Sequence, residues 1–143
     1  MVEGGCLCGS VRYTLSGELP SAYACHCGEC KKQTSSAFSM SMVVAEARLA
    51  VRGEPKCHSR RAHSGAVKDC FFCPDCGTRL WNRSSASAAM VTLKVGTLDD
   101  SAGIAPRGHL WVSRKQVGIM LDPDVPQFET QPDDLRAWRE GLS

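Results

Sequence analysis

Long apolar runs, a strong net charge and an export signal are all missing from this sequence of 143 residues. A membrane-spanning helix needs about 18 or more consecutive apolar residues, so we expect no membrane partner. The formal net charge is only +2, which is too weak to indicate a nucleic-acid partner. No basic region followed by an apolar stretch opens the chain, so we expect a cytoplasmic protein without a secretory signal.

Cysteine, in contrast, is abundant, with nine residues. An odd number excludes a disulfide framework that pairs every cysteine within one chain. In a reducing compartment, closely spaced cysteines are typical of metal or redox chemistry. Hydrophobic residues make up 43% of the chain and charged residues 22%, a balance typical of a globular domain. A domain of this size would gain stability from bound metal.

Short alternating segments predict a mainly β domain of short antiparallel strands. The candidate strands are 11–15, 40–44, 49–52, 71–72, 80–81, 91–95 and 109–112. Two of them, 71–72 and 80–81, flank a cysteine pair as the arms of a hairpin would.

Helix signals are rare. A small C-terminal helix is expected at 132–141, where acidic residues begin the segment and glycine ends it. The small residues at 84–89 and the basic segment 58–63 are expected to be loops, the latter solvated rather than a phosphate site. We therefore divide the chain into a mainly β domain at 1–130 and a C-terminal helix and tail at 131–143.

The segment from Cys73 to Gly77 has the spacing of a zinc knuckle, with two residues between Cys73 and Cys76. This spacing lets both thiolates reach one ion, and the glycine lets the backbone turn and direct N–H groups at sulfur. A thioredoxin-like dithiol shares the spacing but needs a helix after its first cysteine. Because strands are expected on both sides, metal binding is favoured over redox chemistry.

A second pair near the N-terminus is the natural partner of the knuckle, since one pair supplies only half of a tetrahedral structural site. The predicted site holds one Zn²⁺ between Cys6, Cys8, Cys73 and Cys76. It would join the N-terminal segment to the middle of the chain. Backbone amides, Arg12 or Arg79 would offset the negative charge of its four thiolates.

Three further cysteines, Cys25, Cys27 and Cys30, lie within six residues. Three protein ligands and an open position are the signature of a catalytic zinc. The open position would take water or a substrate thiol and would hold that thiol as thiolate. Lys31 and Lys32 follow at once and would favour an anionic ligand.

The alternative is a closed structural site, with a fourth ligand from Cys57, Cys70 or a histidine. Cys57 and Cys70 are expected to be ordinary thiols. His26 lies between two of the candidate ligands and is expected to be a packed residue or a hydrogen-bond donor behind them, rather than a ligand itself.

Together these segments resemble the glutathione-dependent formaldehyde-activating enzyme family, also called the centromere-protein-V/formaldehyde-activating domain. The resemblance runs from about Gly4 to about Phe128, and its segments are 5–13, 25–38, 72–78, 95–100 and 109–113. It implies a Mss4-like β fold with two zinc ions per chain, one structural and one catalytic. The ligand sets that it implies are the two reached above from spacing.

The family's reaction joins glutathione and formaldehyde into S-hydroxymethylglutathione. The resemblance therefore implies a zinc-dependent carbon–sulfur lyase with a small thiol substrate, such as glutathione. His26 or Ser36 is a candidate to handle the proton of the alkoxide. Because a fold alone does not fix function, a zinc-stapled binding domain without catalysis is the alternative.

A glutathione substrate would need cations for its two carboxylates. The candidates are Arg12, Lys31, Lys32, Arg60, Arg61 and Arg114. Spacing does not choose among them, and a monomer and a homodimer are both compatible with the sequence.

Overall fold

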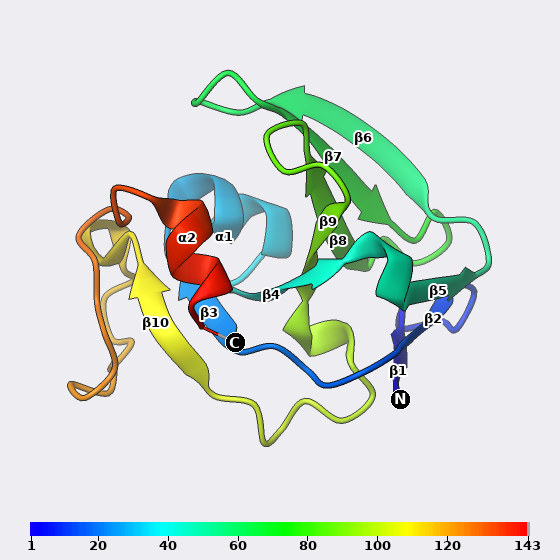
Figure 1. Ribbon diagram of the computed structural model, residues 1–143, viewed down its shortest axis with the longest axis horizontal. Helices are drawn as coiled ribbons and strands as arrows, with labels where there is room; N and C mark the ends of the chain where they lie inside the picture. The colour runs from blue at the N-terminus through cyan, green and yellow to red at the C-terminus, as the bar shows by residue number, and fades with distance from the viewer. Residues whose placement is uncertain (143) are drawn as a thin grey trace.

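The chain folds into two sheets of short strands (Figure 1), and the computed structural model describes residues 1–142. Its strands are β1 (Val2–Gly5), β2 (Arg12–Leu15), β3 (Ala22–Cys25), β4 (Ser39–Ala45), β5 (Leu49–Arg52), β6 (Lys56–Arg61), β7 (Val67–Phe72), β8 (Arg79–Ser84), β9 (Met90–Lys94) and β10 (Pro106–Leu110). Its α-helices are α1 (Gly28–Thr34) and α2 (Leu135–Glu140), and its 3₁₀ turns are η1 (Glu46–Arg48), η2 (Val95–Thr97) and η3 (Val112–Arg114).

Strand order separates the molecule into a small sheet and a large one. The three-stranded sheet has the order β1-β2-β5, and the seven-stranded sheet has the order β10-β3-β4-β9-β8-β7-β6. The described pairings are antiparallel except that of β10 with β3. This architecture confirms the predicted mainly β class. Within residues 1–142, no helix is long and apolar enough to cross a membrane.

The main hydrophobic core packs β2 against the central strands of the seven-stranded sheet. Tyr13 and Leu15 of β2 are buried there with Met42 of β4 and Leu93 of β9. Successive residues of a strand point to opposite faces, so the alternation in 91–94 places one apolar face on this core. Burial of each such Leu or Met side chain contributes about 1.5–3 kcal/mol.

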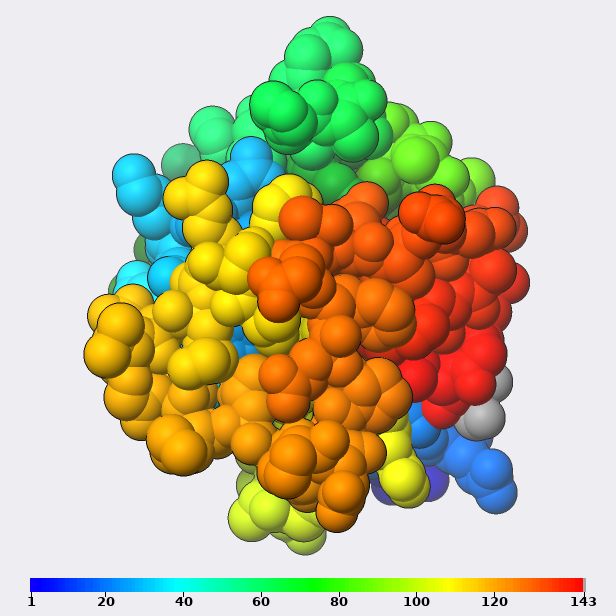
Figure 2. Space-filling view, turned by 90° about the vertical axis from the view of Figure 1, so that its left-hand side faces the viewer, coloured from blue at the N-terminus to red at the C-terminus, as the bar shows by residue number. Residues whose placement is uncertain are grey.

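A second, smaller cluster lies on the opposite face of the seven-stranded sheet. Tyr23 and Cys25 of β3 are buried in it, whereas Ala22 belongs to the main core. Trp138 of α2 packs edge-on against Tyr23, with ring centroids 6.0 Å apart. Figure 2 shows the segment after β10, orange to red, covering much of this side of the molecule. The two faces of one sheet therefore bury different sets of side chains.

Most predicted strands are confirmed, including the hairpin around the cysteine pair, which is β7 and β8. The loop expected at 58–63 is wrong in part, because 56–61 form β6, an edge strand whose side chains stay largely exposed. The strand expected at 109–112 ends at Leu110, because Trp111 adopts a left-handed conformation with φ 58°.

The structure also contains a helix that the sequence did not predict, α1. It buries no side chain, so no apolar stripe marks it in the sequence. The predicted C-terminal helix is confirmed as α2 but begins later, where the Asp134 carboxylate accepts a hydrogen bond from the Ala137 N–H at 2.9 Å. The loop expected at 84–89 is confirmed at 85–89, between β8 and β9.

Candidate metal centres

The structure brings the four predicted cysteines of the first site together. The sulfur atoms of Cys6, Cys8, Cys73 and Cys76 all lie within 4.8 Å of one another. The first two come from the loop after β1, and the last two come from the loop between β7 and β8. Cys8 Sγ is 3.7 Å from Cys73 Sγ, a contact between residues 65 positions apart. The four-cysteine cluster thus joins the N-terminal loop to the β7–β8 hairpin.

Tight turns direct both halves of this cluster. Gly9 and Gly77, each directly after a cysteine, have φ values of 82° and 76°, where a side chain would be strained. The Gly77 N–H donates to the carbonyl of Cys73 at 2.8 Å, and the Val11 N–H donates to Cys6 Sγ at 3.3 Å. The glycine after each pair has the conformational role that the spacing predicts.

Neutral donors, rather than arginines, stabilise charge on these sulfurs. The hydroxyl and backbone N–H of Thr78 lower the pKa of Cys76 to about 5. Arg12 is bonded to the carboxylate of Asp99, and the guanidinium carbon of Arg79 lies 5.6 Å from the centroid of the Phe72 ring. The backbone amides expected to offset the thiolate charge are present, and Arg12 is engaged elsewhere.

The second predicted set, Cys25, Cys27 and Cys30, is also brought together, with all three sulfurs within 4.8 Å. Cys25 ends β3, Cys27 caps α1, and Cys30 lies in the first turn of α1. Cys27 Sγ accepts a hydrogen bond from the Cys30 N–H at 3.4 Å. The short helix that the sequence did not reveal therefore turns Cys30 back over Cys27.

The surroundings of Cys30 in the three-cysteine cluster favour its thiolate form. Hydrogen bonds from Cys25 and Cys27 lower the pKa of Cys30 strongly, and Ser39 and the charge of Lys94 act in the same direction. The same sharing raises the pKa of Cys25. Lys94 on β9 is thus a cation beside this cluster that the sequence did not single out, whereas Lys31 and Lys32 were expected from adjacency.

His26 is fully buried and packs behind the three-cysteine cluster rather than joining it. Its Nε2 lies 3.0 Å from His109 Nδ1, and its ring stacks obliquely on Phe38. Burial, with His109 second, lowers the pKa of His26 to about 4, so the imidazole is neutral at pH 7. Ser36 is exposed, and the hydroxyl that acts on Cys30 belongs to Ser39.

The remaining cysteines stay outside both clusters. Cys57 is exposed on β6, and Cys70 is buried on β7. Within residues 1–142, no fourth Cys, His, Asp or Glu ligand atom joins the three-cysteine cluster. The described part of the chain therefore offers four ligands at one cluster and three at the other.

Both donor sets fit a thiophilic ion such as Zn²⁺. Soft thiolates select ions of this type. A tetrahedral site with Zn–S bonds of about 2.3 Å requires sulfur atoms about 3.8 Å apart. In the four-cysteine cluster, the separations of 3.6 Å for Cys6–Cys8 and 3.7 Å for Cys8–Cys73 are close to that value. The sulfurs of the three-cysteine cluster lie within 4.8 Å of one another.

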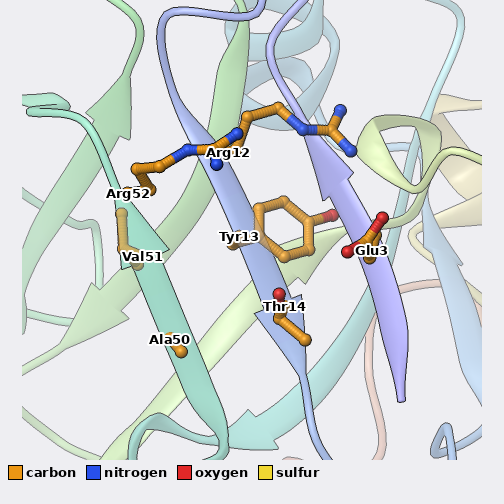
Figure 3. A pocket seen from close by; sticks show the side chains of 7 residues that line it. All are labelled: Glu3, Arg12, Tyr13, Thr14, Ala50, Val51 and Arg52. Carbon is orange, nitrogen blue, oxygen red and sulfur yellow. The ribbon is translucent and has the colours of Figure 1, made fainter.

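Two surface depressions lie away from the three-cysteine cluster. One, of about 300 Å³, lies on the three-stranded sheet, and Figure 3 shows Glu3 of β1, Arg12 of β2 and Arg52 of β5 around it. The other, of about 510 Å³, lies beside the knuckle and is lined by Cys57 and Arg79 among others. Neither includes a member of the three-cysteine cluster.

Fold and site together define a mainly β domain with two cysteine clusters that could bind metal ions. The family model for the glutathione-dependent formaldehyde-activating enzyme matches residues 1–114, and the chain belongs to that family. A crystal structure of a Rhodobacter sphaeroides protein has the same fold, with a TM-score of 0.54 and 20% identity over 88% of this chain and 99% of that one. A search of curated protein sequences finds no match.

Proposed function

We propose that the protein is a zinc-dependent carbon–sulfur lyase that joins a small thiol, such as glutathione, to formaldehyde or a related small aldehyde. The three-cysteine cluster carries this proposal. Its three sulfurs converge without a fourth ligand among residues 1–142, while the other cluster has four. Membership of a family named for formaldehyde activation by glutathione supports the same chemistry.

The reaction needs no oxidant or second cofactor. The thiol sulfur attacks the carbonyl carbon, a C–S bond forms, and the C=O π bond becomes an alkoxide. The proton released by the thiol finally resides on the new hydroxyl group, so the product is a hemithioacetal, and the reverse reaction breaks the C–S bond. When bound, zinc supplies an open position that keeps a thiol ionised near neutral pH.

The remaining roles, which are metal binding, charge stabilisation and packing, belong to side chains of this protein. Cys25, Cys27 and Cys30 would hold the ion and leave its fourth coordination position to the substrate. Ser39 and the ammonium of Lys94 both support negative charge on Cys30. The neutral, buried His26 keeps β3 packed against His109 and is not poised as an acid near pH 7.

The direct test compares two serine variants. Exchange NMR with ¹³C-formaldehyde and glutathione measures how fast the hemithioacetal forms above the spontaneous rate. Cys27→Ser removes one ligand of the three-cysteine cluster, and Cys57→Ser is the matched control because Cys57 is outside both clusters.

We expect about two zinc ions per chain in the parent protein. Loss of metal-assisted chemistry is worth several kcal/mol, so turnover should fall at least about 100-fold in Cys27→Ser and stay unchanged in Cys57→Ser. A Cys27→Ser variant with full turnover would exclude this mechanism. A zinc-loaded parent protein without turnover for any thiol and aldehyde would instead favour the non-catalytic binding domain.

A further inference from the structure

The face of the seven-stranded sheet that carries Cys25 is polar along a continuous row. Strand register places Cys25 opposite Ser39, Tyr23 opposite Ser41, and Ser41 opposite Lys94. Two strands further, the same face carries Cys70 and Lys68 of β7. Polar residues rarely line a covered sheet face unless they bind one another or a ligand.

Lys94 is the most deeply placed cation of this row, with 7% of its surface exposed. Its ammonium donates to Ser41 Oγ at 3.2 Å. Burial lowers the pKa of Lys94, and the negative charges of Cys30, Cys25 and Cys70 act in the opposite direction. A divalent ion held by three thiolates has one net negative charge. Lys94 balances that charge.

Arg139 of α2 reaches the same face from the C-terminal end of the chain. Its guanidinium carbon lies 4.9 Å from the centroid of the Tyr23 ring. Its Nε–H is buried and has no hydrogen-bond partner in the described residues. Strand register connects this position to Lys94, because Tyr23 lies opposite Ser41 and Ser41 lies opposite Lys94. Burial lowers the pKa of Lys68 and of Lys94, and the charge of Arg139 acts in the same direction on both.

The position of α2 is fixed by close packing. Trp138 contacts Tyr23 and Phe128 edge-on, with centroid distances of 6.0 and 5.4 Å. A Cβ at Gly108 would come within 2.4 Å of the Trp138 ring, so only glycine lets α2 approach β10 this closely. These contacts hold α2, and with it the backbone of Arg139, against β3 and β10.

Among residues 1–142, the cations of this face form no ion pair with a carboxylate. The ion pairs described for residues 1–142 are Arg12–Asp99, Arg60–Glu29, Arg83–Glu46 and Arg136–Glu140. Arg12 and Arg60, two of the cations expected for a substrate carboxylate, are thus paired elsewhere. Once Lys94 balances the three-cysteine cluster, Lys68 and Arg139 remain as partly buried charges, which are costly to leave unpaired.

We propose that Arg139 and Lys68, on the sheet face that also carries Lys94, form the subsite that binds a carboxylate of the thiol substrate. This rests on the proposed function and names a specificity determinant for it. Arg139 lies beyond residues 1–114, the part that the family model matches, so the C-terminal helix makes this enzyme selective for anionic thiols. A guanidinium binds a carboxylate in a forked geometry that an ammonium does not offer.

The test is an NMR titration of ¹⁵N-labelled, zinc-loaded protein, which reports the Arg139 Nε–H directly. Three probes separate the contributions: 3-mercaptopropionate has a thiol and a carboxylate, 2-mercaptoethanol has only the thiol, and propionate has only the carboxylate. Arg139→Gln removes the charge and Arg139→Lys retains it. Arg136→Gln is the matched control, because Arg136 is exposed on the same helix.

We expect Arg139→Gln to weaken the binding of 3-mercaptopropionate about tenfold, because one charge-assisted hydrogen bond is lost. Binding of 2-mercaptoethanol should stay within about twofold, Arg139→Lys should be intermediate, and Arg136→Gln should match the parent. The subsite would be excluded if Arg139→Gln lowered the affinity for both thiols equally, or lowered it for neither.

Propionate separates the subsite from the proposed function. The subsite stands if propionate binds the parent protein, shifts the Arg139 Nε–H resonance and binds Arg139→Gln more weakly. This conclusion holds even if 3-mercaptopropionate binds no more tightly than propionate. That second result would count against the thiol chemistry alone. If neither anionic probe binds the parent protein, the subsite is wrong.

Discussion

The two cysteine clusters of this protein both offer sulfur donors, but they differ in how they are assembled from the chain and in how many donors they have. The four-cysteine cluster is assembled from two loops 65 residues apart, with Cys8 and Cys76 exposed and Cys6 and Cys73 buried in the main core. The three-cysteine cluster comes from one stretch of chain, where β3 passes into α1. One joins distant parts of the fold, and the other offers an incomplete set of ligands.

Their surroundings differ as much as their ligands. Backbone amides and the Thr78 hydroxyl face the four-cysteine cluster, and all of these are neutral. Lys94 and Ser39 face the three-cysteine cluster, with Arg139 and Lys68 farther along the same sheet face. The number of ligands and the nearby charge thus distinguish the cluster that we propose to be structural from the one that we propose to be reactive, and each can be changed independently.

The largest expected effect is loss of the fold when the four-cysteine cluster loses a ligand. Cys76→Ser changes an exposed side chain, so its effect isolates the metal from core packing. Structural zinc contributes folding free energy comparable to the whole stability of a domain. We expect a melting temperature lower by more than about 10 °C, measured by circular dichroism.

Two other serine variants calibrate this loss. Cys57→Ser, equally exposed but outside the clusters, should melt as the parent does. The melting temperature of Cys27→Ser should fall much less than that of Cys76→Ser, because the three-cysteine cluster joins no distant segments. A Cys27→Ser variant less stable than Cys76→Ser would reverse the roles given to the two clusters.

A smaller effect is expected from removing the buried charge beside the three-cysteine cluster. Lys94→Met keeps most of the volume and removes the ammonium, so metal affinity at this cluster should fall about 10- to 100-fold. Affinity at the four-cysteine cluster should not change. Competition with a chromophoric chelator measures both affinities.

Lys32→Met is the control for Lys94→Met, since Lys32 is exposed and adjacent to Cys30 only in sequence. It should leave both affinities unchanged. If Lys32→Met lowers the metal affinity of the three-cysteine cluster and Lys94→Met does not, proximity along the chain sets that affinity more than the sheet register that places Lys94.

The smallest effect concerns the two tyrosines, one in each hydrophobic cluster. Burial raises the pKa of Tyr13 and of Tyr23 to about 12. The folded state therefore favours the protonated phenol, and its stability is complete below pH 10 and declines as the pH rises from 10 to 12. Absorbance at the phenolate band should stay flat in the native protein at pH 10 and rise there after unfolding. A phenolate signal near pH 10 in the native protein would show that one cluster is open to water, and Tyr13→Phe would identify which.

Local spacing was enough to predict which cysteines come together, because each half of a cluster lies within a few residues. The pairing of the two halves follows from counting ligands, and the contact between Cys8 and Cys73 agrees with it. The mainly β class follows from alternation, which is visible in 91–95. The helix α1 escaped prediction because its seven residues bury no side chain.

The surroundings of the three-cysteine cluster depend on strand register, which the sequence does not reveal. Ser39 and Ser41 alternate with Met40 and Met42, a pattern that marks one polar face of a strand. Whether that face meets water or a covered cluster depends on α1 and on α2. Lys94 and Arg139 are therefore placed by contacts that span most of the chain.

The most direct test of the difference between the clusters is ¹¹³Cd NMR of protein in which cadmium replaces zinc. We predict two resonances of equal intensity in the region typical of thiolate ligation, of which glutathione shifts one and leaves the other unchanged. The shifting resonance should be the one lost in Cys27→Ser. A single resonance, or two that glutathione leaves unmoved, would contradict an open site beside a closed one.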